Sequence, residues 1–227
     1  AARKIGGALA AGCACIVKPP EETPAAVAQM IECFVDAGVP PGAINLVFGV
    51  PQTISEHLIA SDVIRKISFT GSVAVGQQLA RLAAPGLKRL TLELGGHSPV
   101  IVFDDVDVDA CVRQLVAAKF RNAGQLCHAP TRFFVQRELY PRFVERFAAL
   151  ASQLRIGQGL DERTGLGPLA KARRLRAIGD LVEATRPEAT LVTGGRREHE
   201  QGYFFAPTVF ADVAPQASNL GDVRAAG

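Results

Sequence analysis

The sequence predicts an α/β fold built on a parallel sheet, with helices covering both faces of that sheet. Apolar segments of strand character alternate with segments of helical periodicity from the first residues onward. Strands separated by helices of this length are usually parallel neighbours, because the helix carries the chain back across the sheet. With 227 residues, of which 48% are hydrophobic, the chain is long enough to bury a substantial core.

The first part of the chain carries most of this alternation. A helix ends at Gly12, and the apolar stretch CACIVK after it is typical of a buried strand. The next helix runs from Pro24 to Ala37 and precedes the strand INLVF. The same patterns predict a short helix near residues 53–60, the strand KISFT, a helix over residues 73–84, and the strands LTLEL and PVIVF.

A second α/β series follows the first. The patterns predict a helix over residues 108–120, the strand TRFFVQ, a helix over residues 139–154 and another over residues 171–184. The two series meet near the glycine pair Gly95 and Gly96. We therefore expect two domains, one over residues 1–95 and the other over residues 96–227.

Composition and charge exclude several classes of protein. The net charge is +3 and the basic residues are scattered, which argues against nucleic acid and favours a small-molecule partner. No apolar run approaches the roughly 20 residues that span a bilayer, and no signal peptide is recognisable, so we expect no membrane association. Five widely spaced cysteines, without a second pair at ligand spacing, favour reduced thiols in the cytoplasm and no metal site.

Two stretches have features of a nucleotide site. Gly71 and Ser72 follow a strand and open a helix, where free backbone N–H groups favour a phosphate, although Ser72 is equally an ordinary helix cap. Lys18 and Glu21 follow another strand, at the edge where parallel sheets bind ligands. A carboxylate there accepts hydrogen bonds from ribose hydroxyls and repels a 2′-phosphate; the alternative is a charge pair or a cap for the helix that begins at Pro24.

Two side chains fit a nucleophile and its base. Cys127 follows Asn122, Gly124 and Gln125 in a loop that can present the thiol and its own N–H to a ligand, unless the thiol simply fills the core. A thiolate attacks a carbonyl carbon and can form a thioester. A carboxylate such as Glu93 can activate the water that hydrolyses this thioester. Glu93 ends an apolar strand, where the alternative is an exposed strand-end acid. The remaining cysteines are expected in the core: Cys13, Cys15, Cys33 and Cys111.

Four motifs in one order give the sequence a family resemblance. KPPE, FTGS, LELGG and FRNAGQLC occur in the order and spacing of the aldehyde dehydrogenase superfamily, and the resemblance runs from residue 3 to about residue 217. It implies a Rossmann-like parallel sheet, with residues 1–95 forming part of an NAD(P)-binding domain and residues 96–227 forming part of a thiol-bearing catalytic domain. The expected function is oxidation of a small-molecule aldehyde by NAD, with NADP as the second candidate.

The resemblance also assigns roles to residues. Cys127 matches the nucleophile, whose N–H helps to hold the oxyanion, and Glu93 matches the general base. Lys4 matches a lysine near that base, although exposure to solvent alone would also explain it. The carbonyl of Leu94 and the side chain of Thr70 are expected near the nicotinamide. The residues expected at the adenosine and pyrophosphate of the cofactor are Lys18, Glu21, Gly49, Gly71 and Ser72.

Within the superfamily the chain looks most similar to succinate-semialdehyde dehydrogenases. In those enzymes two arginines bind the distal carboxylate of the substrate, and the matching residues here are Arg3 and Arg121. Two guanidinium groups favour an aldehyde with an anionic end, because their planar forks match a carboxylate. The alternative is that both arginines are structural or surface residues.

The chain also departs from the family. Pro51 and Ser55 stand where many relatives have glycines, which stiffens the loop after Gly49. His128 follows the nucleophile as a pocket or structural residue, and Ala129 replaces the second cysteine of some relatives. Family chains are about twice as long, so we expect an internal fragment of a homo-oligomeric parent. A truncated, inactive nucleotide-binding or interaction fragment is therefore the alternative function.

Overall fold

The computed structural model describes residues 1–214, so the expected end of the family resemblance near residue 217 lies outside them. Its contacts divide the chain into two compact units. Unit 1 comprises Ala1–Phe69 with Gly76–Leu92, and unit 2 comprises Thr70–Val75 with Glu93–Gly227. The expected division of roles between a cofactor domain and a catalytic domain stays a prediction.

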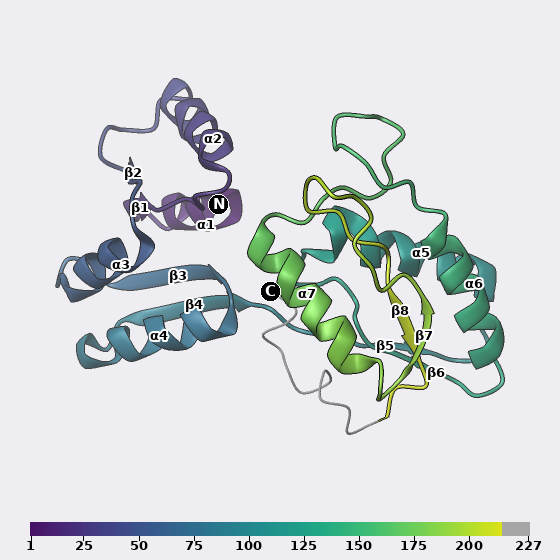
Figure 1. Ribbon diagram of the computed structural model, residues 1–227. Coiled ribbons are helices and arrows are strands. Elements are labelled where there is room, and N and C mark those ends of the chain that lie inside the picture. The colour runs from purple at the N-terminus through teal and green to yellow at the C-terminus, as the bar shows by residue number, and fades with distance from the viewer. Residues whose placement is uncertain (215–227) are drawn as a thin grey trace. The chain divides into compact units, whose positions relative to one another are not determined.

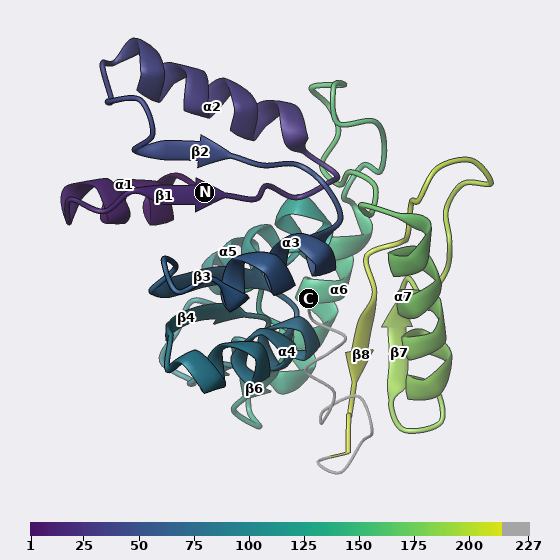
Figure 2. The same ribbon diagram turned by 90° about the vertical axis from the view of Figure 1, so that its left-hand side faces the viewer.

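Unit 1 contains short parallel strands between helices. Figure 2 shows β1 (Cys15–Val17) beside β2 (Ile44–Leu46), and the two pair in parallel with Cys15 opposite Ile44. The helices are α1 (Ala2–Ala10), α2 (Pro24–Asp36), α3 (Pro51–Ala60) and most of α4 (Val73–Ala83). Strands β3 (Lys66–Gly71) and β4 (Arg89–Leu94) pair with each other, and the short turn η1 (Ala84–Gly86) precedes β4.

Proline fixes the start of two of these helices. Pro24 and Pro51 occupy the first helical positions of α2 and α3, where a missing N–H breaks no hydrogen bond and the fixed φ suits a helix. The buried core of this unit is small and consists of Ile59, Leu79 and Ala83, with side chains of β3 and β4 packed against them.

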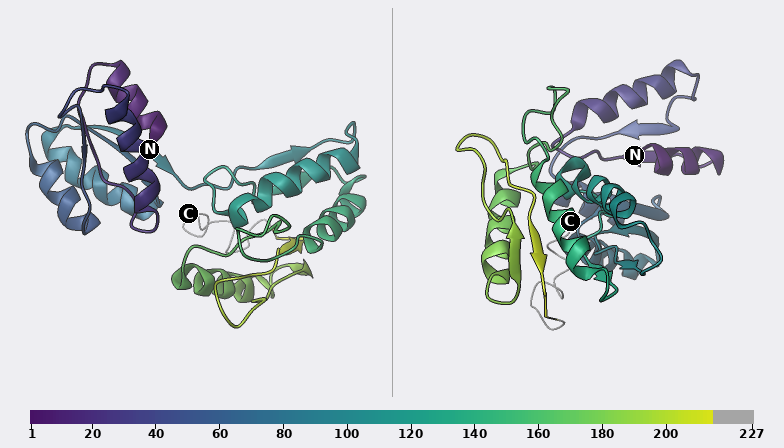
Figure 3. Two further views of the ribbon diagram at one scale, coloured as in Figure 1. Left: turned by 90° about the horizontal axis from the view of Figure 1, so that it is seen from above. Right: turned by 90° about the vertical axis from the view of Figure 1, so that its right-hand side faces the viewer.

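Unit 2 has two strand pairs of opposite sense. Strands β5 (Val100–Val102) and β6 (Phe133–Val135) are parallel, whereas β7 (Thr190–Thr193) and β8 (Val209–Ala211) are antiparallel. The helices are α5 (Val108–Phe120), α6 (Tyr140–Ser152) and α7 (Ala172–Thr185), and a short turn, η2 (Arg121–Gly124), extends α5. Figure 3 shows these elements from two further directions.

One face of α5 forms the core of unit 2. Its buried residues recur every four positions, which places them on a single stripe of the helix: Val108, Val112, Val116 and Phe120. This stripe packs against α6, which lies alongside α5 in Figure 1. The ring centroids of Phe120 and Phe147 lie 6.3 Å apart, and those of Phe133 and Phe147 lie 5.1 Å apart. Helix α5 is thereby held against both α6 and β6.

Ionic contacts join the exposed sides of the same helices. Asp109 on α5 accepts from Arg146 Nε at 2.6 Å and from Arg142 Nη2 at 2.9 Å, both on α6. Arg146, and to a lesser extent Arg142, holds the pKa of the Asp109 carboxyl below its usual range. Asp107 caps the start of α5 by accepting a hydrogen bond from the N–H of Ala110 at 3.1 Å.

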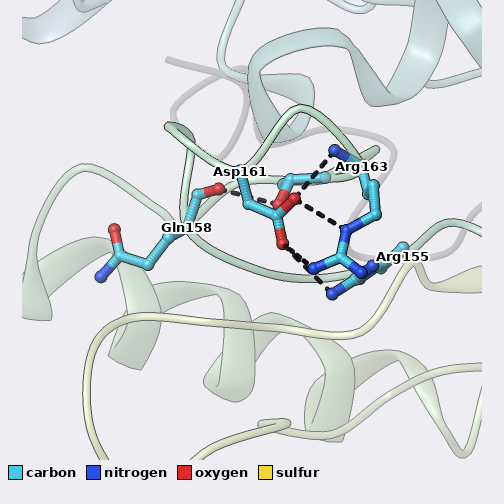
Figure 4. Close-up of polar contacts among 5 residues, drawn as sticks. Arg155, Gln158, Asp161 and Arg163 are labelled. Carbon is cyan, nitrogen blue, oxygen red and sulfur yellow. Dashed lines mark hydrogen bonds and ion pairs between the residues drawn. The ribbon is translucent and has the colours of Figure 1, made fainter.

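A second carboxylate organises the loop between α6 and α7. Figure 4 shows Asp161 accepting hydrogen bonds from Arg163 Nε at 3.1 Å and from Arg155 Nη2 at 3.1 Å. The pKa of Asp161 is lowered, first by the Arg163 side chain and then by the Arg163 backbone N–H. The hydroxyl of Thr164 donates to the carbonyl of Gln158 at 2.7 Å and closes the loop on itself.

The predicted fold class is confirmed, since the described residues form a mixed α/β structure with parallel strands. The described strands form four two-stranded pairs, and the antiparallel pair β7–β8 was not predicted. The core placement of Cys13 and Cys33 was wrong, because both are exposed. In the described part of the chain, no helix is both long and apolar enough to cross a bilayer.

Loss of the Phe147 ring should destabilise unit 2. Phe147→Ala removes a side chain that is 4% exposed and contacts three other rings, so we expect a loss of about 3–5 kcal/mol in the free energy of unfolding. Leu160→Ala is the matched control, because Leu160 is 99% exposed and its loss should change stability by less than about 0.5 kcal/mol. Denaturant unfolding measures both; equal losses would contradict the packing described.

The Asp109 contacts should make stability depend on pH. A carboxyl whose pKa is depressed in the folded state stabilises the protein above its unfolded pKa of about 3.9, and this contribution disappears as the pH falls through the folded pKa. Asp109→Asn should therefore lower the free energy of unfolding at pH 7, and its difference from the parent should vanish in acid. Asp180→Asn, at an exposed carboxylate on α7, is the matched control. A constant Asp109→Asn effect across the acid range would contradict the assignment.

Candidate active site

The loop that bears Cys127 begins with three successive residues in the left-handed region. Asn122, Ala123 and Gly124 have φ values of 52°, 56° and 75°. This conformation is easy for glycine and tolerated by asparagine, whereas alanine adopts it at a cost of about 1–2 kcal/mol. The left-handed conformation turns the chain sharply away from α5. This strained backbone lies close to the expected nucleophile, and strained backbone is often found at functional sites.

Gln125 holds this turn in place. Its backbone N–H and its Nε2 both donate to the carbonyl of Asn122, at 3.1 and 3.0 Å, and the Asn122 side chain donates to the carbonyl of Gln125 at 3.3 Å. Gln125 Oε1 also accepts from the N–H of Ala170 at 2.8 Å. One carboxamide therefore closes the turn and ties it to the segment before α7.

The far side of the loop is clamped to the segment before β5. The backbone N–H and the hydroxyl of Thr131 both donate to the carbonyl of His97, each at 2.9 Å. The His97 ring nitrogen Nδ1 lies 2.8 Å from the same hydroxyl oxygen. Ala129 is 2% exposed and anchors the chain between the clamp and the thiol. Both ends of the loop are therefore fixed.

Cys127 itself is exposed between these fixed ends. Its Sγ lies 3.8 Å from Nδ1 of His128, which is also exposed. This geometry differs from that of Cys15 and Cys111, which are partly buried, and burial raises the pKa of both thiols. Exposure does not match the core alternative for Cys127, and it leaves the sulfur open to a substrate.

The expected general base lies at the end of β4. Glu93 and Leu94 are the last two residues of that strand and are partly buried, so Glu93 is not the fully exposed strand-end acid of the alternative interpretation. Thr70 and Gly71 end the paired strand β3. Ser72 follows them, and its Oγ accepts from the N–H of Val75 at 3.5 Å, which is the geometry of a helix cap.

Unit 1 holds the other expected cofactor residues. Lys18 and Glu21 form an ion pair with each other, and this contact lowers the pKa of Glu21. The charge-pair alternative is therefore what the structure shows in the absence of a ligand. Gly49 has a φ of 143°, and a side chain there would meet Ile54 Cδ1 at 3.2 Å, so the position is strained for any other residue.

The remaining expected residues are dispersed within their units. Lys4 Nζ donates to Ser68 Oγ at 2.9 Å and so joins α1 to β3. Arg3 is exposed on α1 in unit 1. Arg121 is exposed at the end of α5 in unit 2, six residues before the thiol.

Sequence reasoning missed one residue near the loop, Lys119. It lies one turn before the loop on α5, and burial together with the Arg174 charge lowers its pKa to about 8. A detectable signal was present, because this lysine interrupts the apolar run VAAKF at a helix position next to a buried phenylalanine. The expected absence of a metal site stays a prediction.

Comparison with known proteins identifies relatives over almost the whole chain. The model of the aldehyde dehydrogenase family matches residues 1–220. The chain is 52% identical to 4-(hydroxymethyl)benzenesulfonate dehydrogenase TsaD1 of Comamonas testosteroni, over 97% of the chain and 46% of that relative. It is 41% identical to the NADP-dependent succinate-semialdehyde dehydrogenase GabD of Escherichia coli K12, over 95% of the chain and 45% of the relative.

Solved structures give the same result. A mutant of aldehyde dehydrogenase C from Pseudomonas syringae, solved with NAD+ and octanal, superposes with a TM-score of 0.93 at 37% identity. The match covers 98% of this chain and 47% of that structure. The chain thus spans about half the length of the relatives that it matches.

Relief of the strain at Ala123 should stabilise the loop. Ala123→Gly places glycine at a φ of 56°, so we expect a gain of up to about 1 kcal/mol in the free energy of unfolding. Ala117→Gly, on an exposed helical position of α5, is the matched control and should lose about 1 kcal/mol. Thermal unfolding compares the two variants; a loss of stability in both would refute the strained conformation.

Proposed function

Because the chain belongs to the aldehyde dehydrogenase family, we propose that it carries the thiol and cofactor residues of an NAD(P)-dependent aldehyde oxidation. The observation that carries this proposal is the exposed Cys127 at the end of a strained loop that Gln125 and Thr131 hold at both ends. A nucleophile needs such a position, because attack requires an accessible sulfur in a fixed geometry.

In the proposed mechanism the Cys127 thiolate attacks the carbonyl carbon of the aldehyde and forms a thiohemiacetal. The backbone N–H of Cys127 donates to the oxygen that becomes negative. Loss of hydride from the former carbonyl carbon leaves a thioester on Sγ. Glu93 then takes a proton from a water molecule as that water attacks the thioester, which releases the acid and restores the thiol.

The residues present fit a nicotinamide dinucleotide, which would supply the hydride acceptor when bound. Ser72 and the first turn of α4 offer N–H groups and a positive helix end for a phosphate. Lys18 and Glu21 offer a cation and a carboxylate to ribose hydroxyls. We propose NAD as the preferred form, since Glu21 would repel a 2′-phosphate; the relatives include both NAD+ and NADP+ proteins.

We propose an aldehyde with an anionic end as the substrate. The two relatives described above are named for compounds that share this feature, a benzenesulfonate and succinate semialdehyde. Arg121 is exposed six residues before Cys127, and a guanidinium binds either a carboxylate or a sulfonate through paired N–H groups. Arg3 is the second candidate, and Lys4 would assist proton movement near Glu93.

We propose that the reaction takes place in the cytoplasm, in a homo-oligomeric parent protein, although some relatives are named as mitochondrial. We also propose residues 1–95 as the cofactor-binding part and residues 96–227 as the thiol-bearing part.

Activity should depend on Cys127 and Glu93 in different ways. With NAD and either succinic semialdehyde or 4-formylbenzenesulfonate, Cys127→Ser should abolish NADH formation because the nucleophile is lost. Glu93→Gln should lower the steady-state rate by about 10²–10⁴-fold while leaving a first burst of NADH, because hydrolysis follows hydride transfer. Cys33→Ser, at another exposed thiol, is the control. NADH formation by Cys127→Ser would overturn the proposal, and a chain without any turnover would favour the inactive-fragment alternative.

Substrate preference should depend on Arg121. Arg121→Met should raise KM for the two anionic aldehydes by about tenfold, the value of one lost charge-assisted pair, and should leave KM for octanal unchanged. Arg113→Met, at an exposed position of α5, is the matched control. Equal effects of Arg121→Met on anionic and neutral aldehydes would show that this arginine is structural.

A further inference from the structure

A cavity of about 250 Å³ lies within unit 2, behind the loop that carries the thiol. Gly124, Gln125 and Leu126 of the thiol loop line it, whereas Cys127, Glu93 and Arg121 do not. Much of its wall is apolar. The apolar side chains come from α5, from the loop between α6 and α7, and from α7: Phe120, Leu166, Leu169, Ile178, Leu181 and Val182.

The ionisable side chains that line the cavity are all basic. Lys119, Arg132 and Arg174 line the cavity together with His97, whereas no aspartate or glutamate among the described residues does so. Cations gathered in a largely apolar cavity repel one another and are poorly solvated. An anion bound at Lys119 and Arg132 would offset this repulsion and replace the lost solvation.

Lys119 shows this imbalance most clearly. Burial, and then the neighbouring Arg174, lowers the pKa of its ammonium group to about 8. Among residues 1–214, no side chain or carbonyl forms a hydrogen bond or ion pair with its Nζ. A Cβ added at Gly124 would lie 3.7 Å from this Nζ, so the ammonium lies directly under the thiol loop.

Arg132 provides a second, independent sign of a missing partner. Its Nε is buried and has no hydrogen-bond acceptor among the described residues. Buried donors of this kind are rare in folded proteins, because an unmade hydrogen bond to a charged group is costly. Lys119 and Arg132 therefore both line a cavity whose described wall contains no carboxylate.

We propose that this cavity binds a small organic carboxylate, with its apolar body against α7 and its carboxylate at Lys119. The volume accommodates a ring or a short chain, and the wall combines apolar side chains with a few polar groups, as ligand pockets do. A free phosphate would pair with the cations, but it has no apolar part to pack against the apolar side chains of the wall. The proposal does not depend on aldehyde oxidation, because none of the residues assigned to that chemistry lines the cavity.

Titration of the 227-residue chain with benzoate tests the proposal, with calorimetry for affinity and amide chemical shifts for location. Benzamide is the neutral isostere and inorganic phosphate is the anion without an apolar body. We expect benzoate to bind at least about tenfold more tightly than either, with shifts at Gly124 and Ile178. Equal affinity for benzoate and benzamide, or shifts elsewhere in the chain only, would overturn the proposal.

Two variants separate charge from structure. Lys119→Met keeps most of the length of the side chain, removes its charge and should weaken benzoate binding by about tenfold while leaving benzamide unaffected. Arg113→Met, on the exposed side of the same helix, should change neither. Unchanged benzoate affinity in Lys119→Met would contradict the assignment of the carboxylate to this residue.

The pH dependence of the parent chain gives a test that needs no variant. Benzoate affinity should fall as the pH rises from 7 to 9, because Lys119 loses its proton in this range. The arginines of the wall stay charged throughout this range, because a guanidinium is not deprotonated in proteins. Benzoate affinity that is constant from pH 7 to 9 would overturn the role of Lys119.

Discussion

The buried stripe of helix α5 is the constraint on which the rest of unit 2 depends. Val108, Val112, Val116 and Phe120 lie on one side of the helix and fix it against α6 and β6. The last residue of the stripe is also the last residue of the helix, so the packing determines where the chain leaves it. The thiol loop starts at that point, so the core determines where the loop begins, and the contacts of Gln125 and Thr131 fix its course from there.

The loop that follows α5 holds the sulfur of Cys127 exposed to solvent. Three left-handed residues turn the chain, Gln125 closes the turn, and the His97–Thr131 clamp fixes the exit. The strain at Ala123 is small compared with the stability of a domain, and packing on both sides offsets it. A rigid, strained loop costs some stability, and in return it keeps the thiol exposed in one geometry, as the proposed role of a nucleophile requires.

The sequence predicted the elements with strong periodicity and the motifs, because both depend on residues close together in the chain. The α5 stripe and the prolines at the starts of α2 and α3 are of this kind. The short β7 and β8 strands, and their antiparallel pairing, were missed. The exposure of Cys13 and Cys33 could not be predicted, since an apolar pattern does not say which strand or helix faces are covered. The burial of Lys119 also depends on α7, more than fifty residues later.

The proposed role of Cys127 requires a covalent acyl intermediate on its sulfur, which peptide mass spectrometry can detect. The Glu93→Gln variant is incubated with NAD and succinic semialdehyde, quenched in acid and digested. We expect a succinyl group on the peptide that contains Cys127, because the variant hydrolyses the thioester slowly. We expect none on the peptides that contain Cys13 or Cys33. A succinyl group on another cysteine, or an unmodified Cys127 in a sample that has produced NADH, would contradict it.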